Sequence, residues 1–321
     1  MPLPTTKRAE AMKLRIFILF LLGFSTLGFS CSKDGSEGLL PENTMKIPVG
    51  DKSAGSLTKR EFTRALEKVR AVYASIFAEH GLDLEIQNQW DDPTVNAYAL
   101  RKDGKAIVAI FGGLGRHEDM TEDGVILAAC HESGHHIGGI PIKVNGPPIV
   151  DGRRTFNTPW ASNEGQADYF GIMKCFRRVV QGEDHRAALK LVNIDKDFEA
   201  KCNKKFEGEE DRLICIRSIA AGRAISSLFV NVINEELAKS GKPDRIKPVS
   251  FKTPDKRVVI VMDDDHPLPQ CRLDTFFNGA LCDKTISDDV SYTDPDQGVC
   301  SRSEGYTVGV RPLCWYKEMV H

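Results

Sequence analysis

The sequence has no surplus of positive charge and no tract in which lysine and arginine cluster. Its formal net charge is -2 and its pI is about 6.5, so it offers no basic field for phosphate groups, and we expect no nucleic acid partner. The glycine-rich stretch Gly112-Gly113-Leu114-Gly115 lacks the lysine and the spacing of a phosphate-binding loop. No nucleotide cofactor is therefore expected.

Internal repeats, low-complexity tracts and a disorder-prone composition are also missing. Hydrophobic residues make up 41% and charged residues 27% of the 321 positions, which allows one large core or one core with a small appendage. After the N-terminal region, the longest apolar stretch runs from Ile214 to Ile233. Its Arg217 and Arg223 indicate a core helix rather than a membrane span.

The first 31 residues are typical of an export signal. A basic segment, Met12 to Arg15, precedes an apolar run from Ile16 to Phe29 that is too short for a spanning helix. Cys31 follows this run and resembles the lipidated cysteine of a bacterial lipoprotein, which predicts a lipid anchor on the periplasmic side of the outer membrane. Cleavage by ordinary signal peptidase is the alternative, since Gly28 and Ser30 are small enough for it.

The cysteine count agrees with export. Without Cys31, eight of the nine cysteines remain, and an even number in an exported chain favours disulfides. Proximity in the sequence suggests three pairs, each stabilising by about 2–4 kcal/mol: Cys202–Cys215, Cys271–Cys282 and Cys300–Cys314. For Cys130 and Cys175 three possibilities stay open: a bridge, buried thiols, or exchange with a member of those pairs.

Hydrophobic periodicity and turn residues predict the order of helices and strands. The capping box Thr58-Lys59-Arg60-Glu61 begins an amphipathic helix that Gly81 ends. Strands are expected over 82–86, 95–100 and 106–111, the last two joined by a turn at 102–105. A helix should run from Thr121 to Gly138, and the next should open at Thr158-Pro159 and continue to about residue 180.

The segment His131-Glu132-Ser133-Gly134-His135 has the metal-binding spacing HExxH. Four helical residues advance by about 400°, so both imidazoles project within about 40° of each other, one turn apart, as two ligands of one Zn²⁺ require. Glu132 lies beside that face, where it can take a proton from the attacking water. His136 points about 140° away from His131, so we expect it near the ligands or at the surface, and Cys130 is also off the ligand face.

A second acidic motif, Asn163-Glu164-Gly165-Gln166-Ala167-Asp168, follows in the next predicted helix. Glu164 can be a third metal ligand, and Asp168, one turn further along the same face, can accept a hydrogen bond from a ligand histidine. In isolation these carboxylates would be solvated helix charges, but the preceding HExxH favours a shared metal site. The sequence therefore predicts one bound Zn²⁺.

Together these motifs resemble those of the gluzincins. The stretch Glu164 to Gly171 is similar to the ExxADxxG pattern of the HtpX and prenyl-protein endopeptidase family. Asn96-Ala97-Tyr98-Ala99 resembles that family's NAxA stretch, and His266-Pro267 with Arg272 resembles its HPxxxxR motif. The resemblance covers residues from about 60 to 282 and is greater to periplasmic members than to HtpX, whose membrane helices are missing.

This resemblance implies a role for each matching residue. The implied zinc ligands are His131, His135 and Glu164. Glu132 is then the catalytic base, and Asp168 orients His131. His266 approaches the metal or the oxyanion, with a turn histidine outside the chemistry as the alternative, and Arg272 supports the substrate site.

The predicted fold is α+β: a mainly helical, zincin-like metallopeptidase with a small antiparallel sheet next to the HExxH helix. The expected regions are a signal peptide over 1–31, a flexible tether over 32–57, the zinc metallopeptidase domain over 58–282 and a cysteine-containing, disulfide-tied C-terminal extension over 283–321. If the strand over 106–111 is a sheet edge, it can bind the substrate backbone as an added strand. A buried strand without substrate contact is the alternative.

The sequence thus predicts a zinc-dependent endopeptidase of the bacterial cell envelope that acts on peptides or on unfolded or misassembled proteins. The alternative is a non-catalytic or latent zinc-containing envelope assembly or chaperone-like lipoprotein. Glu132 separates the two, because a structural zinc site needs no carboxylate beside its ligands and closes with a fourth protein ligand, for which His266 is the candidate. A zinc hydrolase acting on non-peptide amides is a third interpretation.

Overall fold

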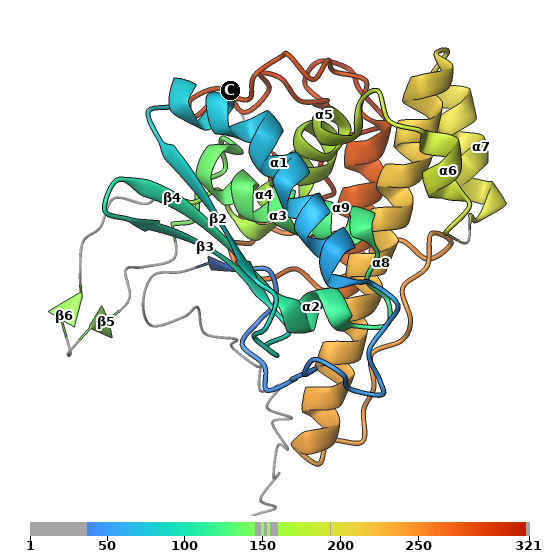
Figure 1. Cartoon of the computed structure of the whole chain (residues 1–321). Helices are drawn as coiled ribbons and strands as arrows, with labels where there is room; N and C mark the ends of the chain where they lie inside the picture. Colours follow the sequence, from blue (N-terminus) through green and yellow to red (C-terminus); the bar gives the residue numbers. More distant parts are fainter. Residues whose placement is uncertain (1–36, 145–148, 151–152, 155–159, 193, 319–321) are drawn as a thin grey trace, which may run out of the picture.

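The computed structural model describes residues 37–144, 149–150, 153–154, 160–192 and 194–318. A small sheet lies along one side of a larger helical body (Figure 1), so the fold is α+β and mainly helical, as predicted. The elements in chain order are β1 (Glu37–Gly38), α1 (Lys59–Glu79), β2 (Asp83–Gln89), β3 (Ala97–Lys102), β4 (Lys105–Phe111), α2 (Gly112–Arg116), α3 (Glu122–Ile137), β5 (Ile149–Val150), β6 (Arg153–Arg154), α4 (Glu164–Phe170), the π-helix η1 (Gly171–Phe176), α5 (Arg177–Val180), α6 (His185–Leu189), α7 (Lys196–Lys205), α8 (Glu209–Lys239) and α9 (Pro269–Leu281).

The main sheet has the strand order β1-β3-β4-β2. β3 and β4 form the predicted hairpin, and its turn residues Asp103 and Gly104 have φ values of 52° and 78°, as a two-residue hairpin turn requires. β2 pairs with β4 in parallel, so the sheet is mixed and the expectation of an antiparallel sheet is wrong. Residues 90–96 connect β2 to β3, which lies on the other side of β4. The hydrophobic periodicity of a single strand does not predict such a crossing.

β4 lies in the centre of this sheet, so it is the buried strand of the two alternatives and not a substrate-binding edge. β2 and β3 flank it on either side, and its Ala106, Val108 and Ile110 are fully buried, which explains its near-continuous apolar sequence. On the β3 side of the hairpin, the two-residue strand β1 is the outermost strand.

Two of the predicted helices support the site, and their predicted ends are confirmed. Thr58 begins α1 with a complete capping box to Glu61, and Gly81 takes a φ of 72° just after this helix. Thr121 caps α3 by accepting a hydrogen bond from a backbone N–H of the first turn. α3 packs against α1, α4, α8, η1 and the hairpin, and it is therefore buried along nearly its whole length.

Several side chains of the segment predicted as a flexible tether, residues 32–57, pack into the core of the protein. Leu39, Leu40, Met45 and Ile47 are only 0%, 1%, 7% and 6% exposed and belong to the main core. These side chains are interspersed with Gly, Ser, Pro and Lys residues, and the average composition is that of a linker. The predicted signal peptide and Cys31 lie outside the described residues.

α4 begins at Glu164, later than predicted. Asn163 is its N-cap and accepts a hydrogen bond from the Gln166 N–H at 2.9 Å, as asparagine favours. The predicted start at Thr158-Pro159 lies outside the described residues. The helix continues through the π-helix η1 and α5 to Val180, the predicted end.

α8 contains the predicted apolar core helix and runs beside α9 (Figure 1). Within the described part of the chain, it is the one helix long and apolar enough to cross a membrane, with a mean hydropathy of 1.6 in its most apolar window. Because 72% of that window is buried inside the protein, α8 is a core helix here.

Four disulfides tie the fold together. The predicted pair Cys202–Cys215 is confirmed, whereas the predicted pairs Cys271–Cys282 and Cys300–Cys314 are wrong. The other three bridges are Cys130–Cys175, Cys271–Cys314 and Cys282–Cys300. The bridge Cys271–Cys314 encloses the bridge Cys282–Cys300, because the chain after α9 folds back over α9 and α4.

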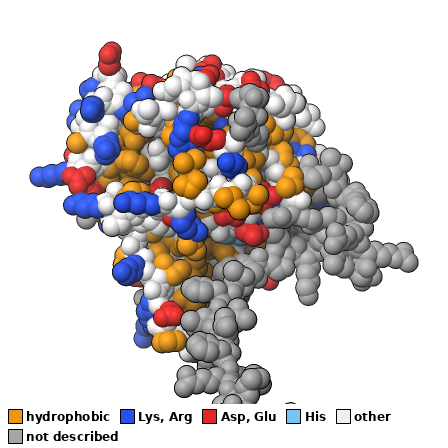
Figure 2. Space-filling view, turned by 180° about the vertical axis from the view of Figure 1, so that it is seen from behind, with side chains coloured by type: hydrophobic (Ala, Val, Ile, Leu, Met, Phe, Trp, Pro, Cys, Tyr) orange, Lys and Arg blue, Asp and Glu red, His pale blue; other side chains and the backbone are white. Residues whose placement is uncertain are grey.

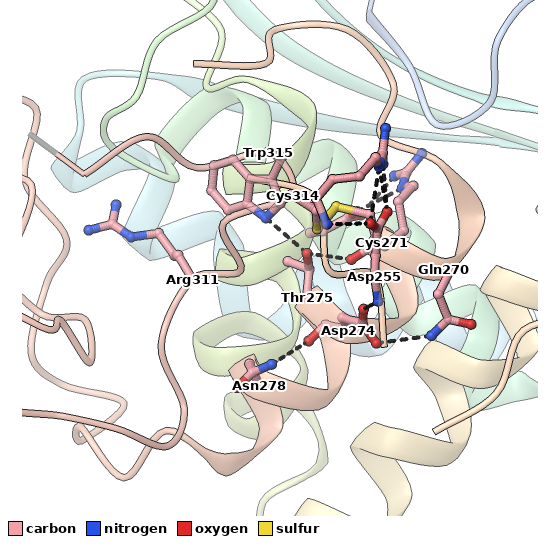
Figure 3. Close-up of a disulfide and its surroundings, with 12 residues drawn as sticks. Asp255, Gln270, Cys271, Asp274, Thr275, Asn278, Arg311, Cys314 and Trp315 are labelled. Carbon is pink, nitrogen blue, oxygen red and sulfur yellow. Dashed lines mark hydrogen bonds and ion pairs between the residues drawn. A yellow bond between two sulfur atoms is a disulfide. The ribbon is translucent and has the colours of Figure 1, made fainter. Parts of the chain in front are cut away.

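The C-terminal extension is tied by disulfides, as predicted, and packs on the elements that carry the site. Trp315 is fully buried, and its Nε1 donates to Thr275 Oγ1 at 2.9 Å (Figure 3). Gly165 of α4 leaves room for this ring, since a Cβ there would lie 2.1 Å from the indole. Tyr169 of α4 donates to the carbonyl oxygen of Gly309 at 2.5 Å. The extension therefore forms a second small core with α4 and α9.

Asp274 on α9 makes this region's stability depend on pH. Its carboxylate accepts hydrogen bonds from the Asp255 N–H at 2.6 Å and from Gln270 at 3.0 Å (Figure 3), and burial raises its pKa to about 6. A carboxyl whose pKa is raised by folding stabilises the fold while protonated, so this stability is lost as the pH rises through about 6. We expect Asp274→Asn to gain on the order of 1 kcal/mol over the wild type between about pH 4 and pH 7.5. Urea unfolding at both pH values measures this gain, and a pH-independent difference between the two proteins would contradict it.

Candidate metal centre

The two histidines of the HExxH motif face each other on α3. Their Nε2 atoms lie 3.1 Å apart, and both side chains are fully buried. Possible ligand atoms of His131, Glu132 and His135 all lie within 4.8 Å of one another. Two ligands of a tetrahedral Zn²⁺ at 2.0–2.1 Å would be separated by about 3.4 Å. The spacing therefore fits one metal ion between the two imidazoles.

Glu164 brings a carboxylate to the same point from the first position of α4. Its oxygens lie 3.4 Å from His131 Nε2 and 3.7 Å from His135 Nε2. Neither oxygen has a hydrogen-bond partner among the described residues, and the side chain is fully buried. A buried carboxylate without such bonds is costly unless a cation compensates it. The donor set of two imidazoles and one carboxylate thus fits Zn²⁺.

Close helix packing sets these positions. A Cβ on Gly134 would lie 2.9 Å from the carbonyl oxygen of Ala167, and one on Gly171 would lie 3.2 Å from the backbone nitrogen of His131. The disulfide between Cys130 and Cys175 joins α3 to η1 next to His131. These contacts hold the segment that follows Glu164 against the histidine helix.

Each ligand histidine has its second ring nitrogen occupied. His131 Nδ1 lies 2.8 Å from Asp168 Oδ1, and His135 Nδ1 lies 2.7 Å from the carbonyl oxygen of Ser162. Because these oxygens accept, each Nδ1 carries the proton and each Nε2 presents its lone pair to the metal position. The structure therefore brings Asp168 to the histidine predicted for it.

Arg272 of α9 holds Asp168 in place. Its Nε and Nη2 donate to the two oxygens of Asp168, both at 2.7 Å, and its guanidinium lies 4.0 Å from the centre of the Phe229 ring. Its Nη1 donates to the carbonyl oxygen of Leu39 at 2.6 Å. Arg272, which was predicted to support the substrate site, thus positions the aspartate behind His131 in this structure.

Burial and neighbouring charges set the protonation of these groups. Burial opposes ionisation of Glu164, but His266 and His135 beside it hold its pKa well below the usual range. Burial lowers the pKa of His135 well below its ordinary value, so this ring is neutral, the form that binds metal. For His131, burial is outweighed by Asp168, which raises its pKa to about 9, so a metal ion would displace the proton on Nε2 as it binds.

Glu132 and His136 lie one turn apart on α3 but have different neighbours. Glu132 is fully buried beside the ligand atoms. His136 points away and is buried rather than at the surface: its ring stacks on Trp160 at 4.8 Å between centroids, and its Nε2 lies 3.1 Å from the carbonyl oxygen of Ile107. It is therefore a packing residue between α3 and β4.

His266 precedes α9 and reaches the edge of the centre. Its Nε2 lies 3.5 Å from Glu164 Oε1 and 2.7 Å from the carbonyl oxygen of Gly38, and its side chain is 13% exposed. A carbonyl only accepts, so Nε2 carries a proton and donates to it. Because Nε2 of His266 is protonated, it acts as a hydrogen-bond donor at the site.

Sequence reasoning missed the polar and backbone groups that surround these residues. Asn96, noted only as part of a motif, exchanges two hydrogen bonds with the backbone of Leu40, at 3.0 and 3.1 Å. The Leu39–Leu40 segment itself was assigned to a tether. Its adjacent pair of leucines was the one signal that pointed to burial.

No family model, no curated protein and no solved structure matches this chain.

Proposed function

We propose that this protein is a zinc-dependent endopeptidase of the bacterial cell envelope, a gluzincin related to the HtpX and prenyl-protein endopeptidase family. One observation carries the proposal: two imidazole nitrogens and the carboxylate of Glu164 converge from α3 and α4, and a second buried carboxylate, Glu132, lies beside them. A purely structural metal site has no need of that second carboxylate.

In this proposal, His131, His135 and Glu164 hold the zinc ion. When bound, zinc polarises the carbonyl of the bond to be cleaved and makes a neighbouring water more acidic. Glu132 takes the proton of the attacking water and passes it to the nitrogen of the leaving amine. Asp168 and the Ser162 carbonyl keep both imidazoles oriented throughout.

A hydrophobic cavity of about 160 Å³ adjoins the centre and suits the side chain of a peptide substrate. Phe229 and Ile233 of α8 form one wall, and His266 and Arg272 are also part of its lining. On the face shown in Figure 2, hydrophobic side chains gather where α8 protrudes from the body of the molecule. We infer that the substrates are extended segments of peptides or of unfolded or misassembled proteins.

His266 is proposed to donate a hydrogen bond to the carbonyl oxygen as negative charge develops on it. Removal of one such donor lowers turnover by about 100-fold or more. We therefore expect His266→Ala to reduce kcat by about 100-fold while zinc content stays at the wild-type level, with the exposed His80→Ala as control. Unchanged turnover would remove His266 from the mechanism, and loss of zinc would make it a fourth ligand.

The second candidate is a latent or non-catalytic envelope lipoprotein. The observation that favours it is the 3.5 Å approach of His266 to Glu164, since a fourth protein ligand would close the site. Lipidation of Cys31 is proposed for either function. Mass spectrometry of the N-terminal segment that contains Cys31 tests it, and an unmodified Cys31 would contradict the anchor.

The peptidase proposal is tested with unfolded casein. We expect the purified, disulfide-intact protein to cleave casein, to lose this activity to a metal chelator and to regain it when zinc is added back. Cleavage that persists after the metal is removed would contradict the proposal. A zinc-loaded protein that never cleaves peptides would favour the lipoprotein alternative.

A further inference from the structure

Residues Gly38 to Leu40 continue from the short strand β1 past His266 and Arg272, at the edge of the metal centre. β1 pairs antiparallel with β3, with Glu37 opposite Ala99 and Gly38 opposite Tyr98. The next residue continues this pairing, since the Leu39 N–H donates to the carbonyl oxygen of Ala97 at 3.1 Å. An extended segment that adds to a sheet edge in this way is a recurrent mode of peptide recognition.

Three side chains, one from α9, one from the loop before it and one from the residue before β3, bind three consecutive backbone units of this segment. His266 donates to the Gly38 carbonyl at 2.7 Å, and Arg272 donates to the Leu39 carbonyl at 2.6 Å. Asn96 binds both the N–H and the carbonyl of Leu40, at 3.0 and 3.1 Å. These hydrogen bonds involve only backbone atoms of the segment. Another peptide with side chains that fit could therefore form the same hydrogen bonds.

The Gly38 carbonyl marks the position of a bond to be cleaved. It is held by His266, whose Nε2 is also 3.5 Å from the carboxylate of Glu164. The following nitrogen, that of Leu39, is oriented by its bond to Ala97.

The side chains of the segment also fit their surroundings closely. Leu39 and Leu40 are 0% and 1% exposed, so the positions after the marked bond accept apolar side chains. Gly38 has little space, because a Cβ there would lie 2.9 Å from the ring of Tyr98. The site therefore selects a small residue before the bond and leucine-like residues after it.

We propose that the enzyme cleaves its own chain between Gly38 and Leu39, an inference that rests on the proposed peptidase function. Water adds to the Gly38 carbonyl carbon, Glu132 takes a proton from it, and the carbon–nitrogen bond to Leu39 breaks. The proton passes to the Leu39 nitrogen, which becomes a free amine, and Gly38 becomes a carboxylate. The part of the chain before Leu39 is then released from the folded protein, and before this event the segment blocks the cleft.

The experiment compares the full-length chain with Glu132→Gln, both expressed identically, with the exposed Glu118→Gln as a matched control. We expect intact-mass analysis and N-terminal sequencing to find Leu39 as the first residue of the wild type and of Glu118→Gln. Glu132→Gln should keep the Gly38–Leu39 bond. A Leu39 N-terminus in Glu132→Gln as well would mean that another protease cuts there and would overturn the proposal.

A second readout needs no turnover. In Glu132→Gln, the amides of Leu39 and Leu40 should be protected from hydrogen exchange, and adding Asn96→Ala should remove the protection of Leu40. If the amides of Leu39 and Leu40 are not protected in Glu132→Gln, the segment is not bound as described and the proposal is overturned. If the wild type cleaves casein but retains the Gly38–Leu39 bond, self-cleavage is wrong and the peptidase function stands. If it cleaves neither, both proposals fail.

Discussion

Glu132→Gln is expected to abolish peptide cleavage and to leave the zinc content unchanged. The substitution keeps the size of the side chain and removes its ability to take a proton from water. A positioned general base contributes about 10²–10⁴-fold to a rate, so casein cleavage should fall by at least about 100-fold. Because the proposed zinc ligands are His131, His135 and Glu164, metal binding should not depend on this carboxylate.

The measurement is kcat/KM on a defined casein fragment, with zinc determined on the same samples. Glu118→Gln, at an exposed position after α2, controls for the general effect of replacing a glutamate. If Glu132→Gln loses zinc together with activity, then Glu132 is a ligand rather than the base. If it retains full activity, the proposed mechanism is wrong.

Asp168→Ala is expected to weaken both the metal site and the fold. Asp168 is fully buried between His131 and the guanidinium of Arg272. Removing one partner of a buried ion pair leaves the other charge uncompensated and costs about 3–5 kcal/mol. Loss of the carboxylate behind a ligand histidine lowers metal affinity by about 10–100-fold.

The two effects can be measured separately. Urea unfolding of the zinc-free proteins reports the loss of the ion pair with Arg272, and zinc competition against a chelator reports the loss of orientation at His131. Asp265→Ala, at an exposed position, is the control. An Asp168→Ala protein with wild-type stability and zinc affinity would contradict the roles given to Asp168.

The local features of the fold were predictable from sequence because their causes are local. The capping box at Thr58, the cap at Thr121 and the turn at Asp103-Gly104 each depend on a few adjacent residues. The same holds for the helical spacing of His131 and His135, since a helix fixes where the fourth residue points. The hydrogen bond between His131 and Asp168 was also predictable, because the two helical motifs were interpreted as parts of one site.

The features that sequence reasoning missed depend on long-range packing. The parallel pairing of β2 with β4 and the bridge from Cys271 to Cys314 join segments whose relation no local pattern encodes. The burial of Leu39 depends on the edge of β3 and on Arg272, which are distant in the sequence. The residues around Leu39 have the composition of a linker. A prediction from average composition therefore misses a short segment that packs onto the protein.

The most direct test of the central claim is the zinc stoichiometry of the wild type beside Glu164→Gln. The replacement preserves shape but removes the charge of a carboxylate that lies 3.4 and 3.7 Å from the two histidine nitrogens. We predict one zinc ion per wild-type chain and far less than one in Glu164→Gln, with both proteins folded. One zinc ion bound with equal affinity by both proteins, or none by the wild type, would contradict a metal centre built from His131, His135 and Glu164.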